Sequence, residues 1–481
     1  MRKQQSMSIL VIDIGSSSVR AMLFDDHAEP MPNADSQRKH QFEYGQDGAV
    51  TANPQHLQTL VEDCISELLT KTRDPIDAVG ISCFVGNLMG LDNTGTPITP
   101  LYTYADTRSQ QHVNAITLDV NASYHRTGCR LHSAYNTLKL YWLKQTQAGL
   151  VSQVDCWLDF ASYLYLQWFS ETLTSYSIAS WSGLLNREHL TWDEIWLNLL
   201  ELNSSRLPQL ADVDDTLQGL QSPYSEKWSA LADVPFYLAI GDGAGANLGS
   251  GAVDSNYAAL SVGSTSALRT ISQATLPTIP DGLWSYRVTA SQHLIGGATT
   301  EGGTAFAWAR DILSLTDDDL AELSSRPADS HGLTILPLFA GERSPNWRGN
   351  AKATLHGLSL STSKLDIVQA VLESVALRIA SIADMLLADD VTIMASGGAI
   401  TASSVWAQMM ANAMNRPLNI ITGETSARGI AVLVLSHLHG TQWSDYMPTV
   451  QAHITPQAYA VDTLQIARDR QQSLYQMLYQ S

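Results

Sequence analysis

The sequence of 481 residues is poor in cysteine and contains no long apolar run. Its four cysteines, Cys64, Cys83, Cys129 and Cys156, match neither a zinc site nor a disulfide framework in their spacing, which is typical of a reducing compartment. No apolar stretch reaches the roughly 18 residues of a membrane span, and the apolar stretch at 9–12 is too short for a signal peptide. We therefore expect a cytoplasmic protein without a membrane segment.

Basic residues are also scarce, because 28 Lys and Arg face 47 Asp and Glu, a net charge of −19 with histidine neutral. This balance excludes a general nucleic-acid binder, which carries a basic face. A hydrophobic content of 44% with 16% charged residues excludes extended disorder. Because the overall charge repels anions, any site for a phosphate or an acidic substrate must be built from local groups.

Two segments about half the chain apart share one pattern, in which an apolar strand leads into a turn of glycine and hydroxyl residues and a second strand returns. They occupy residues 8–25 and 257–270. The repetition predicts an internal duplication with two α/β domains, 8–256 and 257–475. Apolar residues at helical spacing predict helices at 54–71, 136–144, 162–169, 304–313, 364–388, 402–415 and 426–438.

The two turns have the composition of a phosphate-binding loop. The first is Gly15-Ser16-Ser17-Ser18 and the second is Gly263-Ser264-Thr265-Ser266. Glycine lets the backbone approach a ligand, and consecutive amides and hydroxyls can hold phosphate oxygens. Asp13, at the end of the strand before the first turn, is a candidate ligand for the magnesium ion of a nucleotide. The alternative for either turn alone is an ordinary surface turn, but as a pair they favour a triphosphate held between two domains.

Asp242 lies between Gly241 and Gly243 and follows the apolar residues 236–240, so we expect it at a strand end near the start of a helix. The neighbouring glycines leave room for its carboxylate to reach a substrate hydroxyl as a general base. Phosphoryl transfer from ATP needs such a base, together with positioning and charge neutralisation. The alternative is an N-cap in a glycine-rich turn.

Two later segments are rich in turn residues. The glycine pair at 397–398 follows the expected strand 391–395 and permits close approach of a flat ring or a phosphate, although a tight strand-to-helix turn has the same pattern. Residues 341–351 are typical of a functional loop or an interdomain hinge. For Arg343 and Arg348 in this loop, surface ion pairs are the alternative.

Seven motifs in this order resemble those of the FGGY carbohydrate kinases. They are Asp13-x-Gly-Ser-Ser-Ser, Tyr104-Ala-Asp106-Thr-Arg108, Gly241-Asp-Gly, Gly263-Ser-Thr, Glu342-Arg-Ser-Pro-x-Trp, Ser396-Gly-Gly-Ala and Glu424-x-Ser-Ala-Arg-Gly. The resemblance covers nearly the whole chain. It implies an α/β protein of two actin-like (ribonuclease H-like) domains, with ATP and a sugar in the cleft between them and domain closure that excludes water.

The resemblance also implies roles for individual residues. Asp242 is the expected catalytic base and Asp13 the expected magnesium ligand. The nucleotide-binding candidates are Gly15, Ser16, Ser17, Ser18, Gly263, Ser264, Thr265, Gly303, Gly397, Gly398 and Ala399. The substrate-binding candidates are Asn87, Asp106, Arg108, Arg130, His132 and Asp242. The expected cofactors are ATP and Mg²⁺, the expected partner is a small sugar or sugar acid, and the family is compatible with a homodimer.

The segment 127–140 resembles the gluconate kinases of the family, which favours gluconate as the substrate, with xylulose or another ketose or polyol as the alternative. Three positions depart from the family pattern. Gly86 replaces the histidine of a Met-His pair, Tyr104 replaces a tryptophan, and Arg130 replaces a proline. For the carboxylate of gluconate, the candidate cations are Arg108, Arg130, His132 and Lys139, with a solvated loop arginine as the alternative at position 130.

Two hypotheses from other classes compete with a kinase. One is a non-catalytic actin-like nucleotide binder, and the other is a sugar sensor, which the lost histidine at position 86 favours. Neither needs Asp242 between two glycines together with both turns and Asp13. The sequence therefore favours direct in-line transfer to a primary hydroxyl, without a phosphoenzyme.

Overall fold

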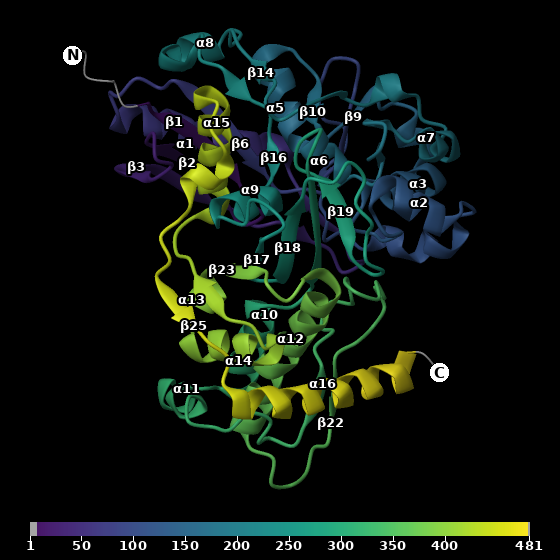
Figure 1. The fold of residues 1–481 in the computed structure, drawn as a ribbon. Helices are drawn as coiled ribbons and strands as arrows, with labels where there is room; N and C mark the ends of the chain where they lie inside the picture. The colour runs from purple at the N-terminus through teal and green to yellow at the C-terminus, as the bar shows by residue number, and fades with distance from the viewer. Residues whose placement is uncertain (1–6, 480–481) are drawn as a thin grey trace, which may run out of the picture.

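A computed structural model describes residues 7–479 and divides them between two lobes, each built on a seven-stranded sheet (Figure 1). The strand order of the first sheet is β14-β15-β6-β1-β2-β3, with β16 beside β6. Its strands are β1 (Ile9–Ile14), β2 (Ser18–Phe24), β3 (Pro30–Lys39), β6 (Ala78–Cys83), β14 (Thr216–Leu217), β15 (Phe236–Tyr237) and β16 (Ile240–Gly241). The expected pair of α/β units is present.

The first expected hairpin is confirmed, since β1 runs antiparallel to β2. On its other side β1 runs parallel to β6, and all six of its residues are buried, as expected for a central strand covered on both faces. Asp13 is opposite Arg20 on β2 and opposite Ser82 on β6. Polar side chains therefore meet at the carboxyl end of this sheet.

Helix α1 (Pro54–Lys71) packs on β2 and β3 and has the bounds that its apolar spacing predicts. The side chain of Asn53 accepts a hydrogen bond from the His56 N–H, and proline at the first position has the φ angle that a helix start needs. One face carries the buried residues Leu57, Val61, Cys64, Ile65 and Leu68.

The second sheet has the order β19-β20-β18-β17-β23-β24-β25. Its strands are β17 (Tyr257–Val262), β18 (Ser266–Ser272), β19 (Trp284–Arg287), β20 (His293–Thr299), β23 (Thr392–Ser396), β24 (Leu418–Ile420) and β25 (Ala452–Ile454). The second expected hairpin is confirmed by antiparallel β17 and β18, and β17 is parallel to β23 just as β1 is parallel to β6. The central topology of the two lobes is thus the same.

Helices surround the second sheet (Figure 1). They are α10 (Gly303–Leu313), α11 (Asp317–Leu323), α12 (Lys364–Leu386), α13 (Gly398–Thr401), α14 (Ser404–Met414) and α16 (Ala458–Tyr479). The central helix α12 begins with a capping box between Ser363 and Asp366 and packs on β18 and β20. A separate two-stranded sheet pairs β21 (Thr334–Leu336) with β22 (Thr354–His356).

Helix α15 (Thr425–His439) follows β24 in sequence but packs on the first lobe, against β1, β6 and α9 (Asp242–Gly249) (Figure 1). Glycines permit the approach: a Cβ on Gly429 would lie 1.9 Å from the Gly245 carbonyl oxygen, and a Cβ on Gly80 would lie 2.4 Å from Ile430. After α15 the chain returns to the second sheet at β25. The domain boundary near residue 256 remains a prediction, and the first lobe draws one helix from beyond it.

Residues 84–235 add helices and short strands to the first lobe and also contact the second. The main elements are β7 (Met89–Leu91), α2 (Val120–Thr127), α3 (Asn136–Thr146), β9 (Cys156–Leu158), α5 (Phe160–Phe169), α6 (Tyr176–Ser180) and α7 (Glu194–Leu200). Trp181 stacks on Tyr286 of β19 with ring centroids 3.7 Å apart, and the hydroxyls of Tyr135 and Tyr286 lie 2.6 Å apart. An aromatic contact therefore joins the lobes on this side.

Several smaller expectations are settled by the structure. All four cysteines are free, as their spacing predicts. Within residues 7–479, no helix has an apolar stretch of the length that a membrane crossing needs. The apolar run 236–240 does not form one strand but splits into β15 and β16, because β15 and β16 pair with different ends of β6.

Candidate active site

The carboxyl ends of three neighbouring strands place the two aspartates that the sequence singles out. Ser82 of β6 is paired with Asp13 on one side and with Ile240 of β16 on the other. Asp242 follows β16 as the first residue of α9, which confirms its expected place between a strand and a helix. The two aspartates are close enough for the charge of Asp13 to raise the pKa of Asp242.

Asp13 is a buried carboxylate, 4% exposed, with one oxygen in use and one free. Its Oδ2 accepts a hydrogen bond from Ser426 Oγ at 3.1 Å and lies 3.6 Å from Arg20 Nη1. Its Oδ1 is buried without a hydrogen-bond partner. Burial raises the pKa of Asp13, while hydrogen bonds and the charge of Arg20 act in the opposite direction. A buried carboxylate oxygen with free lone pairs fits the oxygen-ligand preference of a divalent cation.

Asp242 has the pKa of a general base that operates near neutral pH. Burial raises this pKa to about 6, against the lowering effects of the Arg269 charge and of the hydrogen bond from the Gly243 N–H at 2.8 Å. Since N-cap geometry belongs to Gly241 and not to Asp242, the carboxylate is not used to cap the helix. It is left available for proton transfer.

The glycine and hydroxyl turns lie at the tips of the two hairpins. In the first, the Gly15 N–H donates to the Ser18 carbonyl at 2.9 Å, and a ring nitrogen of His40 lies 3.0 Å from the Gly15 carbonyl. In the second, Gly263 and Ser264 are exposed. The Gly303 N–H donates to the Gly263 carbonyl at 2.7 Å, which ties the second turn to the start of α10.

The nucleotide candidates of the second lobe come together around this turn. A Cβ on Gly303 would lie 3.0 Å from the Gly263 carbonyl oxygen and 3.2 Å from the Ala399 Cβ. Gly397 has φ of +105°, and a Cβ there would lie 2.5 Å from the Val262 carbonyl oxygen, whereas Gly398 faces open space. The glycine pair is thus both a tight strand-to-helix turn and an open surface beside α10. The tight strand-to-helix turn is present, and the approach of a ring or a phosphate to Gly398 remains a prediction.

Three substrate candidates are hydrogen-bonded within the first lobe. Asp106 is 1% exposed and accepts hydrogen bonds from Arg108 Nη2 at 2.6 Å and from the Val50 N–H at 3.3 Å. The Arg108 guanidinium also lies 4.7 Å from the centre of the Trp142 ring. The Asn87 amide donates to the Phe84 carbonyl at 2.5 Å and accepts from the Phe160 N–H at 2.8 Å. Direct contact of these residues with a substrate remains a prediction.

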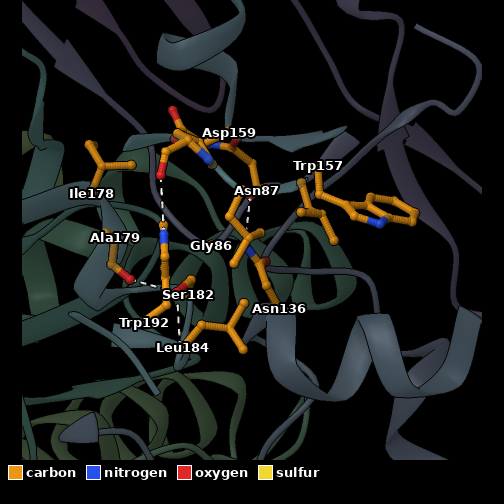
Figure 2. Close-up of a pocket in the computed structure, with 13 residues that line it drawn as sticks. Gly86, Asn87, Asn136, Trp157, Asp159, Ile178, Ala179, Ser182, Leu184 and Trp192 are labelled. Carbon is orange, nitrogen blue, oxygen red and sulfur yellow. Dashed lines mark hydrogen bonds between the residues drawn. The ribbon is translucent and has the colours of Figure 1, made fainter. Parts of the chain in front are cut away.

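Asn87 also lines a cavity of about 30 Å³, the size of one water molecule (Figure 2). Asn136 and Asp159 lie on its wall, and Asn136 Oδ1 is buried without a hydrogen-bond partner. The Asn136 amide nitrogen donates to the Asn87 carbonyl at 3.0 Å. The cavity is too small for a sugar.

The other candidate cations for a substrate carboxylate differ in their contacts and in their protonation. Arg130 forms an ion pair with Asp281 of the second lobe and lies 3.8 Å from the centre of the Tyr124 ring. Burial lowers the pKa of His132 to about 3, so this ring is neutral. Burial lowers the pKa of Lys139 to about 7, and its Nζ donates to the Ser133 carbonyl at 2.6 Å. Their roles toward a substrate remain predictions.

Gly86, which replaces the histidine of the family pattern, lies close to Tyr104. Gly86 has φ of +69°, and a Cβ there would lie 2.9 Å from the Ala134 carbonyl oxygen and 3.0 Å from the Tyr104 Cβ. A histidine at position 86 would therefore be strained and crowded. Burial raises the pKa of Tyr104, and the charge of Asp242 acts in the same direction while that of Arg343 opposes it.

Four charged or polar residues near the aspartates were not singled out as site residues by the sequence. Arg20 and Ser426 contact Asp13, and Arg269 and Arg343 lower the pKa of Asp242. The register of the expected hairpin could have identified Arg20, because Arg20 is paired with Asp13. Arg269 is the one charged residue in the hairpin segment 257–270, a pattern that favours a functional cation. The positions of Ser426 and Arg343 depend on contacts between distant parts of the chain.

The two lobes contribute different chemical groups to this region. The first lobe supplies a buried carboxylate with a free oxygen and a carboxylate with a pKa near neutrality. The second supplies an exposed hydroxyl-rich turn and a glycine pair beside the start of a helix. Such a set can hold a polyphosphate and remove a proton from a hydroxyl.

Two models of known protein domains match most of the chain. The model described as the N-terminal domain of the FGGY family of carbohydrate kinases matches residues 8–249, and the C-terminal domain of that family matches residues 258–437. The chain is 26% identical over 451 residues to a Bacillus subtilis (strain 168) protein named gluconokinase, covering 89% of this chain and 87% of that protein.

Two solved structures from Lactobacillus acidophilus are similar over the whole chain. One is described as a gluconate kinase and the other as a ligand-bound xylulose kinase. Each superposes with a TM-score of 0.91 at 25% identity and covers 98% of both chains. The two-lobed fold expected from the sequence motifs is therefore confirmed.

Proposed function

Because the chain belongs to the FGGY family of carbohydrate kinases and is a phosphotransferase with their actin-like fold, we propose that it transfers the terminal phosphoryl group of ATP to a primary hydroxyl of a small sugar acid, with gluconate as the favoured substrate. The observation that carries the proposal is the pair Asp13 and Asp242 at the ends of the two strands that flank β6, in a chain whose other lobe carries an exposed hydroxyl-rich turn. A non-catalytic nucleotide binder would not need the second aspartate.

In the proposed reaction, Asp242 accepts the proton of the substrate hydroxyl while that oxygen attacks the terminal phosphorus. A pKa of about 6 leaves most of the carboxylate ionised at neutral pH and still basic enough to take a proton. The glycines on either side keep bulky side chains away from the approaching hydroxyl. No phosphorylated residue is part of this pathway.

The phosphates of ATP would be held by backbone amides and hydroxyls of the turns 15–18 and 263–266, which take up negative charge as the bond breaks. Asp13 would hold Mg²⁺ through its free Oδ1, directly or through water. When bound, this ion neutralises phosphate charge. Gly303, Gly397, Gly398 and Ala399 would line the adenosine side, where the glycine pair leaves room for a flat ring.

Gluconate is favoured over xylulose because the segment 127–140 resembles gluconate kinases and because a gluconokinase is among the similar proteins. Xylulose remains the second candidate, since a xylulose kinase has an equally similar structure. The neutral state of His132 does not argue for either one.

The test is ATP consumption with a panel of acceptors that includes gluconate, xylulose, ribulose, glycerol, fuculose, rhamnulose and erythritol. We expect gluconate to give the largest kcat/KM, and Asp242→Asn provides the background rate. Preference for a ketose or polyol would move the substrate assignment without affecting the kinase assignment. Binding of a sugar without turnover of any acceptor would instead support the sensor hypothesis.

A further inference from the structure

Two arginines of the second lobe, Arg269 and Arg343, approach Asp242 without an anionic partner of their own. Arg269 stands on β18, and its Nη1 donates to the neutral Ser261 hydroxyl at 3.2 Å. It reaches the first lobe, because a Cβ on Gly243 would lie 3.3 Å from Arg269 Nε. That Nε is buried without a hydrogen-bond acceptor.

Arg343 enters the same region from the loop that follows β21. The Ser344 N–H donates to the Ala298 carbonyl at 3.0 Å, which fixes the loop to β20, the neighbour of β18. Trp347 of this loop packs against His132 of the first lobe, with ring centroids 5.4 Å apart. Arg343 Nε is also buried without an acceptor. Among residues 7–479 neither Arg269 nor Arg343 forms a salt bridge, unlike Arg20, Arg108 and Arg130.

The two guanidinium groups leave an unbalanced positive charge at the junction of the lobes. Each lowers the pKa of Asp242, and Arg343 helps burial to lower the pKa of Arg269 to about 10, which is the effect of two nearby like charges. His132 is neutral here. In a chain with a net charge of −19, two unpaired cations beside one carboxylate call for an anionic ligand.

The position of Arg269 favours a substrate carboxylate over a nucleotide phosphate as its ligand. Arg269 is three residues beyond Ser266, the last residue of the hydroxyl-rich turn, so its backbone is about 10 Å farther along the strand. Its partner Ser261 is likewise set back from Gly263. The backbone of Arg269 is therefore set back from phosphates held at the turn.

We propose that Arg269 and Arg343 form a carboxylate-binding site for the acceptor substrate, so that the enzyme selects sugar acids over neutral sugars. The inference rests on the proposed function and adds the residues that choose the substrate class. Planar guanidinium groups match the two oxygens of a carboxylate, and charge-assisted hydrogen bonds of this kind are about twice as strong as neutral ones. Because both arginines belong to the second lobe and Asp242 to the first, such a substrate bridges the lobes.

The test measures binding of D-gluconate and of its neutral analogue D-glucitol by calorimetry without nucleotide, in wild type and in Arg269→Met and Arg343→Met. We expect wild type to bind gluconate at least 10-fold more tightly than glucitol. Each variant should lose about 10–100-fold in gluconate affinity and little in ADP affinity. Arg348→Met, an exposed arginine of the same loop, is the matched control and should bind as wild type does.

Kinetics separates this role from a role in phosphate binding. For the methionine variants we expect a higher KM for gluconate and a smaller change in kcat. Arg269→Lys and Arg343→Lys should restore part of the affinity, because lysine keeps the positive charge but lacks the two parallel N–H donors of a guanidinium group. Weaker ADP binding, or an equal loss of kcat for every acceptor, would assign the arginines to the phosphoryl group and overturn the proposal. Equal effects of Arg343→Met and Arg348→Met would also overturn it.

Failure of the proposed function gives a different result. If wild type binds gluconate through the arginines but does not phosphorylate it, the carboxylate site stands and the kinase assignment for gluconate fails. If wild type phosphorylates a neutral sugar and binds gluconate no more tightly than glucitol, the kinase assignment stands and the carboxylate site fails. Melting temperatures of the five variants identify any that do not fold.

Discussion

The hairpin of the first lobe and the hairpin of the second have the same topology and opposite electrostatic character. Asp13 and Ser261 each precede the turn glycine by two residues, and each is paired with a serine of the parallel strand, Ser82 or Ser396. One position carries a buried carboxylate and the other a hydroxyl. A single backbone arrangement thus carries an acid in one lobe and a neutral side chain in the other.

The arginines follow from this difference. In the first lobe Arg20 is paired directly opposite Asp13 and bonds Glu424 at 2.6 Å, so its charge is balanced. In the second lobe Arg269 bonds only the neutral Ser261 hydroxyl among the described side chains and keeps its charge for a ligand. The absence of an acid at position 261 is what leaves the cation free.

The largest expected effect comes from removing the base of the first lobe. Asp242→Asn should lower kcat by roughly 10²–10⁴-fold, because the amide has a similar shape but accepts no proton. The measurement is steady-state ATP consumption at saturating gluconate. Asp214→Asn, an exposed acid of the same lobe, is the control and should retain full activity. A fully active Asp242→Asn enzyme would refute the assignment of the base.

Converting the first hairpin to the chemistry of the second tests the comparison directly. Asp13→Ser introduces the residue that the second lobe has at the equivalent position, and it should lower kcat/KM about 100-fold and raise the Mg²⁺ concentration needed for half-maximal rate. A Mg²⁺ titration of the variant measures both effects. An unchanged Mg²⁺ dependence would show that this carboxylate does not serve the cation.

The pH profile probes the influence of one lobe on the other. Asp242 acts as a base only when deprotonated, and burial raises its pKa to about 6, so kcat/KM should fall tenfold per pH unit below about pH 6. The charge of Arg269 lowers this pKa, so Arg269→Met should move the acid limb to higher pH. An acid limb near pH 4 in wild type would contradict the burial of the base.

The smallest expected effect concerns the glycine pair. At the positions of Gly397 and Gly398 in strand register, the first lobe has Cys83 and Phe84. Gly397→Ala should destabilise the protein by about 2 kcal/mol, because its φ is +105° and its Cβ would meet the Val262 carbonyl oxygen. Urea unfolding measures this loss. Gly398→Ala, which faces open space, should unfold as wild type does, and equal stability of the two variants would contradict the comparison.

Local patterns predicted the parts of the site that lie next to one another in sequence. The two hairpins, their turns and the start of α9 at Asp242 follow from strand patterns, glycines and a helix boundary. The pairing of Asp106 with Arg108 is also local, but the same two residues suit a substrate site or a buried ion pair, and sequence alone does not distinguish them.

The remaining parts depend on long-range packing. Ser426 reaches Asp13 only because α15 crosses to the other lobe, and Arg343 faces Asp242 only because its loop is fixed to β20. A single sequence carries no signal for such contacts. The unpaired state of Arg269 likewise depends on which side chains surround it after folding.

The crossing of α15 has a consequence for how such a molecule can arise and be divided. An ancestral doubling of one gene segment would yield two self-sufficient halves, yet here the earlier half takes its covering helix from the later one. Separating the halves would uncover the apolar faces of β1 and β6, including the surface over Gly80. The first lobe thus needs the later part of the chain to complete its own core.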